Sequence, residues 1–451
     1  MGRLFGTDGI RGVANRYPIT CEIALKTGRA VGLFAKEGGY KTVIIGKDTR
    51  ISGDMLESAL AAGVSSTGID VFLAGVIPTP GVAYLCSDIK NAGAGIVISA
   101  SHNPYQDNGI KIFKHGGEKL SEEQENKIED YILGGDSVPR GNVGKIAVIS
   151  DSLERYSAFL LSMFPFKKLD KKLKLVIDSS NGAASKIAHM VFNDKLFNVQ
   201  FIYDSPDGKN INDSCGSQHT QELQRLVVKE KADIGLAFDG DADRFIAVDE
   251  NGNEITGDRI LAVCAKFAKE RENLNKNVVV STIMSNIGLG KTLASLGIDH
   301  IKSDVGDRKV LEEMKRSGAV IGGEDSGHMI FLDYHTTGDG MLSALKLLEV
   351  MMETGQSLSS LTSVMTVYPQ VLMNVEVDES RPDFMKIKII ADTIKAVERK
   401  LGDRGRVLIR YSGTQPLLRV MVEGPDQSQV ERYCQDICKS IKKTFKRKTG
   451  I

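Results

Sequence analysis

Short apolar runs recur along most of the chain, and each is followed by a polar loop and then by helical spacing. Apolar runs of this length are typical of strands that are buried on both faces of a parallel sheet. The predicted strands are 41–46, 71–74, 95–99, 110–113, 173–178, 199–202, 233–238, 277–281 and 319–321. The predicted helices are 52–63, 121–133, 153–164 and 288–296, and a turn is predicted at 78–80. Repeated strand–loop–helix units predict α/β domains in tandem.

From about residue 370 the pattern changes to alternating strands and a helix, which indicates an antiparallel α+β domain. The strands there are predicted at 371–377, 406–410 and 417–422, and the helix at 383–400. We therefore predict three similar α/β domains with mixed, mostly parallel sheets, followed by a smaller α+β domain. The predicted boundaries are 1–150, 151–250, 251–367 and 368–451.

Composition narrows the class of protein. Lysine and arginine together number 58, as do aspartate and glutamate, so charge gives no support for a nucleic acid partner. No apolar run approaches the ~18 residues that span a bilayer, and the first residues lack the apolar core of a signal peptide. The six cysteines show no metal-binding spacing. We therefore expect free thiols in a cytoplasmic protein without membrane contacts.

The segment 96–104, IVISASHNP, joins a predicted buried strand to a polar loop. Pro104 disfavours helix at Asn103, so the loop should persist there. Ser101 then lies at the carboxyl end of a strand, where open α/β sheets bind their ligands. We predict that the chemistry happens on the Ser101 hydroxyl; the alternative is a polar loop that merely ends a strand.

Three carboxylates, Asp239, Asp241 and Asp243, alternate with small residues directly after a predicted strand. Alternate side chains of an extended loop point the same way, so all three can converge on a hard cation, which favours Mg²⁺. A calcium EF-hand loop would also use Glu250, but it needs glycine at its sixth position, where Arg244 stands. An acidic turn without a metal is the other alternative.

The loop 322–328, GGEDSGH, again alternates functional side chains after a predicted strand. Glu324 and Ser326 offer a carboxylate and a hydroxyl on one side, a combination that suits adjacent sugar hydroxyls. His328 adds a group that titrates near neutral pH. The alternative is an ordinary glycine-rich connection.

A fourth polar loop, 410–416, lies between two strands of the last domain. Arg410, Ser412 and Thr414 offer a guanidinium and two hydroxyls beside flexible backbone amides, which suits a phosphate. Arg419 could join this set. The alternative is an ordinary turn rich in glycine and proline.

Two further segments are weaker signals. The N-terminal loop 5–12, FGTDGIRG, carries Arg11, which could reach a phosphate. The segment 288–292, GLGKT, is reminiscent of a nucleotide-binding P-loop, but Ser285 stands where that pattern needs glycine. Helix packing is the better explanation of 288–292.

Together the loops provide a nucleophilic hydroxyl, a metal site, sugar-binding groups and a phosphate site, which are the parts needed for phosphoryl transfer to and from a phosphosugar. ASHNP, DGDADR, GEDSGH and RYSGTQP, in this order, resemble the four signatures of the α-D-phosphohexomutase superfamily. Within it, FGTDGIRG and VGDRKV resemble the phosphoglucosamine mutases. The resemblance implies a C-terminal domain of TATA-binding-protein-like fold and a deep central cleft, which that domain closes to exclude water.

The resemblance also implies roles for single residues. Ser101 is similar to a serine that carries a phosphoryl group in the active enzyme. Asp239, Asp241 and Asp243 match Mg²⁺ ligands, with one ion in each active site and an oxygen of the phosphorylated Ser101 completing the set. These assignments are expectations from family resemblance.

The remaining matches concern the transferred group and the sugar. Arg11 and Arg244 match arginines beside the phosphoryl group, and Lys111 and His328 match positions that assist proton transfer. The matched ligands of the sugar hydroxyls and of the phosphate that is not transferred are Glu324, Ser326, Arg410, Ser412, Gly413 and Thr414. Gln415 and Asp325 depart from the usual family pattern, and Asp325 leaves the sugar open.

The implied reaction interconverts glucosamine 6-phosphate and glucosamine 1-phosphate through a 1,6-bisphosphate intermediate. We expect Asp307 and Arg308, within VGDRKV, to help select the group at C2 of the sugar. A phosphomannomutase/phosphoglucomutase on the same machinery is the near alternative, and a sugar-phosphate-binding protein without turnover is the distant one. The oligomeric state is open, with a homodimer as one alternative.

Overall fold

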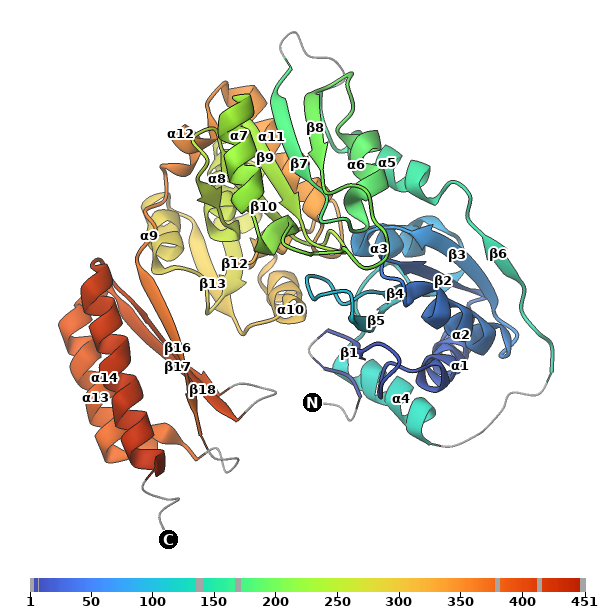
Figure 1. Cartoon of the computed structure of the whole chain (residues 1–451), viewed down its shortest axis with the longest axis horizontal. Coiled ribbons are helices and arrows are strands. Elements are labelled where there is room, and N and C mark those ends of the chain that lie inside the picture. The colour runs from blue at the N-terminus through green and yellow to red at the C-terminus, as the bar shows by residue number, and fades with distance from the viewer. Residues whose placement is uncertain are drawn as a thin grey trace. The chain divides into compact units, whose positions relative to one another are not determined.

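The computed structural model describes residues 4–6, 8–134, 141–166, 172–377, 382–411 and 416–446. The chain forms two compact units, one of residues 1–284 and 297–364 and the other of residues 285–296 and 365–451 (Figure 1). The four predicted domain boundaries remain a prediction.

The first sheet of the larger unit has the strand order β1-β5-β4-β2-β3-β6. Its strands are β1 (Ile10–Val13), β2 (Thr42–Lys47), β3 (Asp70–Val76), β4 (Ala92–Ile98), β5 (Asp107–Lys114) and β6 (Ile146–Val148). Its helices are α1 (Cys21–Glu37), α2 (Gly53–Ser65), α3 (Thr79–Asp88) and α4 (Glu122–Leu133). Strand β4 runs parallel to β2 and antiparallel to β5, so the sheet is mixed. A capping box starts α4, where Ser121 and Gln124 exchange hydrogen bonds.

The second sheet has the order β11-β10-β9-β7-β8. The acidic loop, residues 239–244, connects its neighbouring strands β9 and β10. Its strands are β7 (Lys174–Asp178), β8 (Asn198–Ile202), β9 (Ile234–Phe238), β10 (Phe245–Asp249) and β11 (Glu254–Ile255). The helical segments before and within it are α5 (Ser152–Ser162), α6 (Ala184–Val191), η1 (Gly216–Gln218) and α7 (Gln221–Glu230). Strand β7 is parallel to β8 and β9, and β9 is antiparallel to β10.

The third sheet has the order β13-β12-β14-β15. Its strands are β12 (Val278–Thr282), β13 (Asp299–Ser303), β14 (Ile321–Gly323) and β15 (Met329–Phe331). The helical segments of this region are α8 (Gly257–Glu270), η2 (Asn275–Asn277), α10 (Asp307–Ser317), α11 (Gly340–Thr354) and α12 (Leu358–Thr362). Strand β14 is parallel to β12 and antiparallel to β15. The loop from β14 to β15 therefore lies at the carboxyl end of the parallel pair β12–β14.

The smaller unit holds an antiparallel sheet of order β16-β18-β17. Its strands are β16 (Gln370–Glu376), β17 (Arg406–Tyr411) and β18 (Leu417–Glu423). Its helical segments are α9 (Ile287–Ser295), η3 (Phe384–Lys386), α13 (Lys388–Leu401), η4 (Gly402–Arg404) and α14 (Gln427–Lys446). Helices α13 and α14 pack side by side on this sheet (Figure 1). Cys434 and Cys438 are buried in that packing, on one face of α14.

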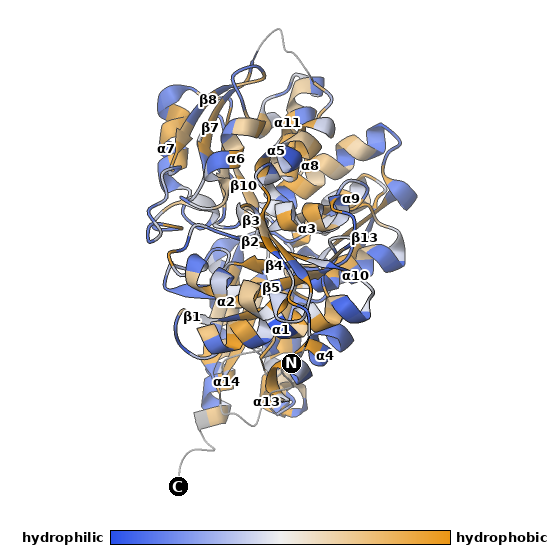
Figure 2. Cartoon of the chain, turned by 90° about the vertical axis from the view of Figure 1, so that its right-hand side faces the viewer, coloured by the Kyte–Doolittle hydropathy of each residue, from blue (hydrophilic) through white to orange (hydrophobic). Residues whose placement is uncertain are grey.

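Hydrophobic residues gather on the central strands, such as β7 and β10, while helices such as α7 carry both hydrophobic and polar stretches (Figure 2). Every residue of β4, β9 and β12 is buried, as their apolar runs predict, and every residue of β10 is buried as well. Among the described residues, no helix has both the length and the apolar character needed to cross a membrane. The predicted fold class, three α/β sheets and a small α+β unit, is confirmed.

One predicted turn, at 78–80, is wrong, because helix α3 starts at Thr79. Pro78 occupies the N-cap and Pro80 lies in the first turn, where a missing N–H costs nothing because it would have no intrahelical partner. The two prolines therefore begin a helix. The first residue of helix α3, Thr79, contacts Asp241.

Candidate functional site

The Ser101 backbone adopts a left-handed conformation, with a φ of 55°. Left-handed backbone is uncommon for residues other than glycine and is held only where the surroundings enforce it. The backbone N–H of Ser101 donates to Ser99 Oγ at 2.9 Å, and the Ser101 residue is almost fully buried. The loop after β4 thus presents one hydroxyl in a fixed orientation.

That hydroxyl meets the acidic loop of the second sheet. Ser101 Oγ donates to Asp239 Oδ2 at 2.7 Å, across 138 positions of sequence. Carboxylate oxygens of Asp239, Asp241 and Asp243 all lie within 4.8 Å of one another, and the three residues are buried. The convergence predicted from alternate spacing is therefore present, and Ser101 is brought to the same place.

The charges of this cluster are unevenly compensated. Burial, together with the carboxylates of Asp243 and Asp241, raises the pKa of Asp239 well above its ordinary value. Burial opposes ionisation of Asp243 too, but Lys111 and then His328 hold the pKa of Asp243 well below its usual range. Negative charge at Asp239 is thus less compensated than negative charge at Asp243.

The cluster fits a hard cation. Asp241 Oδ1 and Asp243 Oδ1 are buried and have no hydrogen-bond partner among the residues that the structure describes. Buried carboxylate oxygens without partners are costly unless a cation or water satisfies them. With the Asp239 carboxylate and the Ser101 oxygen they form an all-oxygen donor set, which is the set that Mg²⁺ prefers.

Lys111, on β5, reaches into the same cluster. Its Nζ lies 2.8 Å from Asp241 Oδ2, 3.3 Å from Asp243 Oδ2 and 3.2 Å from Asp8 Oδ2. Burial alone would lower the pKa of Lys111, but these carboxylates raise it well above the ordinary value. Lys111 is therefore a buried ammonium at neutral pH.

Two arginines lie at the more open side of the cluster. Arg11, on β1, pairs with Asp8 at 2.6 Å, and its side chain is 30% exposed. Arg244 follows the acidic loop, is 21% exposed, and its Nε lies 3.9 Å from Asp243 Oδ1 without a hydrogen-bond partner among the described residues. Two accessible guanidiniums beside a buried hydroxyl can receive an anionic group such as a phosphoryl group.

The third sheet brings His328 to the cluster. His328 Nδ1 lies 3.7 Å from Asp243 Oδ2, and its Nε2 lies 3.7 Å from Asp307 Oδ2, at the start of α10. Burial alone would lower the pKa of His328, but Asp243 and Asp307 raise it. The imidazole is therefore buried between two carboxylates. Lys119 pairs with both Asp307 and Asp8, so Asp307 is linked to the first sheet.

The sugar-binding candidates Glu324 and Ser326 lie in the loop between β14 and β15. Glu324 Oε1 accepts the backbone N–H of Gly306 at 3.1 Å, which ties this loop to the VGDRKV segment. Ser326 Oγ is buried, and no described residue bonds to it. An unsatisfied hydroxyl beside a carboxylate leaves hydrogen-bonding capacity for a ligand.

The substrate-selecting pair predicted from VGDRKV divides into two parts. Asp307 contacts the cluster through His328, as described above. Arg308 instead forms an ion pair with Glu125 of α4, with Nη1 and Oε2 2.6 Å apart. The structure therefore places Asp307 at the site and gives Arg308 a partner on a helix of the first sheet.

Arg410 and Arg419 lie in the smaller unit, directly opposite each other on β17 and β18. Burial and then the charge of Arg419 lower the pKa of Arg410. Two guanidiniums in register suit one anion between them. The other predicted members of this phosphate site, Ser412, Gly413 and Thr414, lie outside the described residues.

Several contacting residues were not predicted from the sequence. Thr79, the first residue of α3, donates its hydroxyl to Asp241. His102 Nδ1 lies 3.2 Å from Ser101 Oγ, and burial, with the charges of Arg244 and Arg11, lowers the pKa of His102 to about 4. A neutral imidazole therefore lies against the serine. Arg50 and Asn212 contact the serine loop, which is the segment 99–106 between β4 and β5. In the sequence, only the polarity of these two residues could have indicated this contact.

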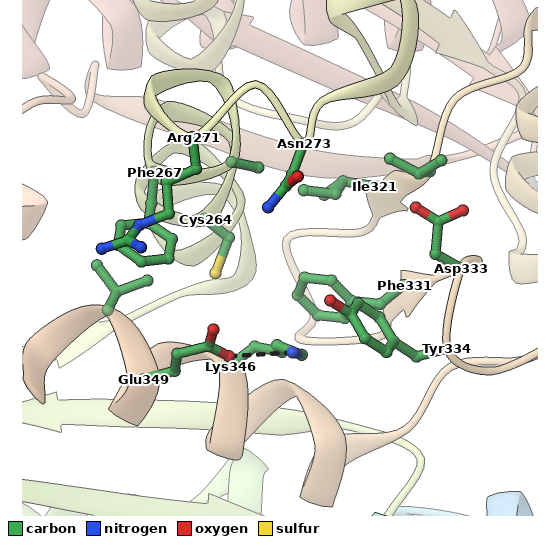
Figure 3. A pocket seen from close by; sticks show the side chains of 13 residues that line it. Cys264, Phe267, Arg271, Asn273, Ile321, Phe331, Asp333, Tyr334, Lys346 and Glu349 are labelled. Atoms are coloured by element: carbon green, nitrogen blue, oxygen red, sulfur yellow. Dashed lines mark hydrogen bonds and ion pairs between the residues drawn. The ribbon is translucent and has the colours of Figure 1, made fainter. Parts of the chain in front are cut away.

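A separate cavity of about 250 Å³ lies between α8, the β14–β15 hairpin and α11 (Figure 3). Cys264 and Phe267 line it from α8, with Lys346 and Glu349 from α11. Lys346 is held over the ring of Tyr334, 3.9 Å from its centroid. None of the predicted site residues lines this cavity, so it lies apart from the carboxylate cluster.

Comparison with known proteins matches this arrangement along the whole chain. Profiles of phosphoglucomutase/phosphomannomutase α/β/α domains I, II and III match residues 2–138, 154–252 and 256–368, and the C-terminal domain profile matches 372–440. The phosphoglucosamine mutase of Desulforapulum autotrophicum is 61% identical over 98% of this chain and 99% of its own length. That of Syntrophus aciditrophicus is 51% identical over 98% and 99%.

Solved structures share the fold. A phosphoglucomutase/phosphomannomutase family protein from Burkholderia thailandensis superposes with a TM-score of 0.81 at 24% identity, covering 97% of each chain. The Aspergillus fumigatus N-acetylphosphoglucosamine mutase, solved with GlcNAc-6P and magnesium, gives a TM-score of 0.71 at 16% identity, covering 98% of this chain and 96% of that one.

Proposed function

This chain belongs to the phosphoglucomutase/phosphomannomutase family of phosphohexomutases, and we propose that it interconverts glucosamine 6-phosphate and glucosamine 1-phosphate, with Ser101 as the phosphoryl carrier. The sugar follows from near full-length identity of 49–61% to phosphoglucosamine mutases. The enzyme class predicted from the four motifs is thereby confirmed.

One observation carries the choice of Ser101. Its hydroxyl lies 2.7 Å from Asp239, and two partly exposed arginines, Arg11 and Arg244, are close enough for their charges to act on the adjacent His102. A nucleophile, a site for a divalent cation and receptors for a phosphoryl group therefore lie within one buried cluster. Phosphoryl transfer needs mainly positioning and compensation of charge, and this cluster is suited to both.

The proposed metal is one Mg²⁺ in each site. Asp239, Asp241 and Asp243 would hold it, with an oxygen of Ser101 or of its phosphoryl group. When bound, the ion withdraws charge from phosphoryl oxygens. The unpartnered Oδ1 atoms of Asp241 and Asp243, counted among the described residues, support this assignment.

The reaction then follows from the chain's own groups. The bond between Ser101 Oγ and phosphorus breaks as a sugar hydroxyl oxygen bonds to that phosphorus, and the hydroxyl loses its proton. The resulting 1,6-bisphosphate turns over and returns its other phosphoryl group to Ser101. Arg11 and Arg244 compensate the charge of the moving group. Lys111 and His328 exchange protons with the reacting oxygens. The raised pKa of Lys111 keeps its ammonium protonated at neutral pH, so Lys111 enters the reaction in the donor form but as a weak acid.

Recognition of the rest of the substrate is assigned by loop. Glu324 and Ser326 bind hydroxyls of the sugar ring, and Asp307 contributes to the choice of the C2 group. The phosphate that is not transferred binds Arg410, together with Arg419, Ser412, Gly413 and Thr414. A cytoplasmic location and a homodimer belong to this proposal as well.

Ser101→Ala tests the carrier. The variant should still bind phosphosugar yet lose nearly all turnover, because the covalent acceptor is gone. Intact-mass measurement of the active wild-type enzyme should show one phosphoryl group that is absent from Ser101→Ala. Wild-type-like turnover in the variant would overturn the mechanism.

A panel of sugars tests the substrate. We expect kcat/KM for glucosamine phosphate to exceed that for glucose and mannose phosphates at least about tenfold, since one lost buried hydrogen bond costs ~1–3 kcal/mol. Asp307→Ala should narrow this preference more than it lowers overall transfer. A preference for glucose or mannose phosphate would favour the phosphomannomutase/phosphoglucomutase alternative and leave the chemistry intact.

A further inference from the structure

We propose that Arg50 and Asn212 are positioning residues that hold the backbone of the serine loop from two different domains and so orient Ser101 for phosphoryl transfer. The inference rests on the proposed role of Ser101. Neither residue is among those that the sequence motifs assign to the reaction. Each acts on main-chain carbonyls, and neither has a described contact to a reacting atom.

Arg50 follows strand β2 and is buried, with a relative exposure of 3%. Its Nη2 donates to the carbonyls of Ser101 at 2.9 Å and Asn103 at 2.8 Å. Its Nη1 donates to the carbonyls of Pro104 and Asp107.

The remaining guanidinium donor, Nε of Arg50, bonds to Asp48 Oδ2 at 2.9 Å. All five N–H donors of the guanidinium are therefore engaged, three of them by carbonyls of the serine loop and one by the carbonyl of Asp107, the first residue of β5. Asp48 balances the charge, because both side chains of this ion pair are fully buried. A lysine at position 50 would offer three donors and could not reproduce the planar fork.

Asn212 approaches the same carbonyls from the second domain. Its Nδ2 donates to Ser101 O and to Asn103 O, each at 2.9 Å. The carbonyl oxygens of Ser101 and Asn103 thus each accept one bond from Arg50 and one from Asn212. Both lone pairs of each oxygen are used, which fixes the orientation of both peptide planes.

The acidic loop packs against the Ser101 carbonyl that Arg50 and Asn212 both contact. A Cβ placed on Gly240 would lie 2.6 Å from the Ser101 carbonyl oxygen and 2.8 Å from Asn212 Nδ2. Gly240 stands between Asp239 and Asp241, so the acidic loop can approach only because position 240 lacks a side chain. The Ser101 carbonyl, which accepts hydrogen bonds from Arg50 and Asn212, is therefore also the point of contact between the serine loop and the acidic loop.

This geometry explains how Ser101 keeps a φ of 55°. Left-handed backbone at a serine is uphill, and the four donated bonds compensate it. If one donor is lost, the peptide can relax, and the hydroxyl moves relative to Asp239. Because a displacement of ~1 Å can cost about 10²-fold in rate, the effect should fall on kcat.

The experiment compares Asn212→Ala, Asn212→Asp and Arg50→Lys in the full chain with Mg²⁺ and glucosamine 6-phosphate. Asn212→Asp keeps the shape but turns a donor into an acceptor that faces two carbonyls. We expect kcat to fall about 10-fold in Asn212→Ala, further in Asn212→Asp, and about 10²-fold in Arg50→Lys, with KM within about threefold of wild type.

Asn210→Ala is the matched control, because Asn210 lies in the same loop and bonds to Ser205 and Asp207 without a described contact to the serine loop. It should retain wild-type kcat. A smaller loss in Asn212→Asp than in Asn212→Ala would show that only shape matters and would overturn the proposal. So would a loss confined to KM.

Hydrogen–deuterium exchange provides a readout independent of turnover. Amides of the peptide covering residues 99–107 should exchange faster in Asn212→Ala and Arg50→Lys, while those of β2 keep their wild-type rates. Unchanged exchange in 99–107 would overturn the proposal. Wild-type enzyme without mutase activity would instead refute the proposed function, and the exchange result would still decide whether Arg50 and Asn212 hold the loop.

Discussion

Gly338 provides a sharp test of whether the position of His328 limits the reaction. A Cβ built on Gly338 would lie 2.2 Å from His328 Nε2 and 2.3 Å from Cε1. The backbone of Gly338 lies outside the left-handed region, so alanine meets no backbone penalty there. The main effect expected of Gly338→Ala is therefore the collision with the imidazole.

The collision cannot be relieved cheaply. Ordinary carbon contacts lie near 3.5–4.0 Å, so the ring or the methyl group must move by more than about 1 Å. His328 is 3% exposed and lies between Asp243 and Asp307. Overpacking of this kind costs about 1–3 kcal/mol of stability, and a displaced catalytic group costs about 10²-fold in rate. We expect kcat of Gly338→Ala to fall about 10²-fold while the variant still folds.

The assay is steady-state turnover of glucosamine 6-phosphate, with thermal unfolding measured on the same samples. Gly355→Asn is the control, because Gly355 caps the end of helix α11, which begins two residues after Gly338. Gly355 has a φ of 66°, and no described atom outside its immediate chain neighbours lies within 4 Å of where a Cβ would be. Asparagine tolerates left-handed backbone, so this variant should keep wild-type kcat.

A double-mutant cycle identifies the cause. In a His328→Ala background the imidazole is absent, so adding Gly338→Ala should lower kcat by less than about threefold. If Gly338→Ala costs the same factor with and without His328, then the imidazole is not what the methyl group displaces, and the reasoning fails. Full activity of Gly338→Ala in the wild-type background would refute it as well.

Two further predictions concern charge. Asp241→Asn removes one carboxylate from the cluster and should weaken Mg²⁺ binding, measured by calorimetry, and lower activity together; undiminished activity in excess chelator would contradict the metal assignment. Burial raises the pKa of Asp178 to about 7 from an ordinary value of 3.8. The neutral carboxyl therefore stabilises the folded state below about pH 4, and this contribution is lost as the pH rises through about 7. The free energy of unfolding of Asp178→Asn, measured with denaturant at several pH values, should therefore rise relative to that of wild type from pH 4 to pH 8, by at most about 4 kcal/mol. A constant difference in unfolding free energy across that range would rule out the pKa shift.

The strand and loop pattern was predictable because each functional loop directly follows an apolar run. The acidic triplet, Ser101 and His328 all occupy such positions, and parallel pairing places each of their loops at the carboxyl edge of its own sheet. The family assignment rests on these same loops, and the comparisons confirm it. Local sequence was therefore sufficient to predict the candidate residues that belong to a motif.

Residues that act through distant partners were not predictable. Arg50 lies 51 positions from Ser101, and Asn212 lies 111 positions away. In the sequence both lie among polar turn residues. Nothing in the local sequence distinguishes a residue that only forms a turn from one that also hydrogen-bonds to a distant loop. Lys119 reaches Asp307 over 188 positions. Such contacts depend on how domains pack, which periodicity does not encode.

The contact between Ser101 and Asp239 has a consequence for how the site is loaded. Without phosphorylation, the serine hydroxyl donates a hydrogen bond to Asp239. This bond partly satisfies a carboxylate whose pKa is already raised by burial and by its neighbours. If Ser101 is phosphorylated, as proposed, Oγ has no proton to donate, and a phosphoryl group of charge about −2 faces the same carboxylate. Lys111 is already shared between Asp241, Asp243 and Asp8, so it cannot fully compensate this added charge. Either Asp239 takes up a proton or a divalent cation lies between the two groups. Phosphorylation of Ser101 and cation binding should therefore strengthen each other, and this coupling is reciprocal because both act on the same charge.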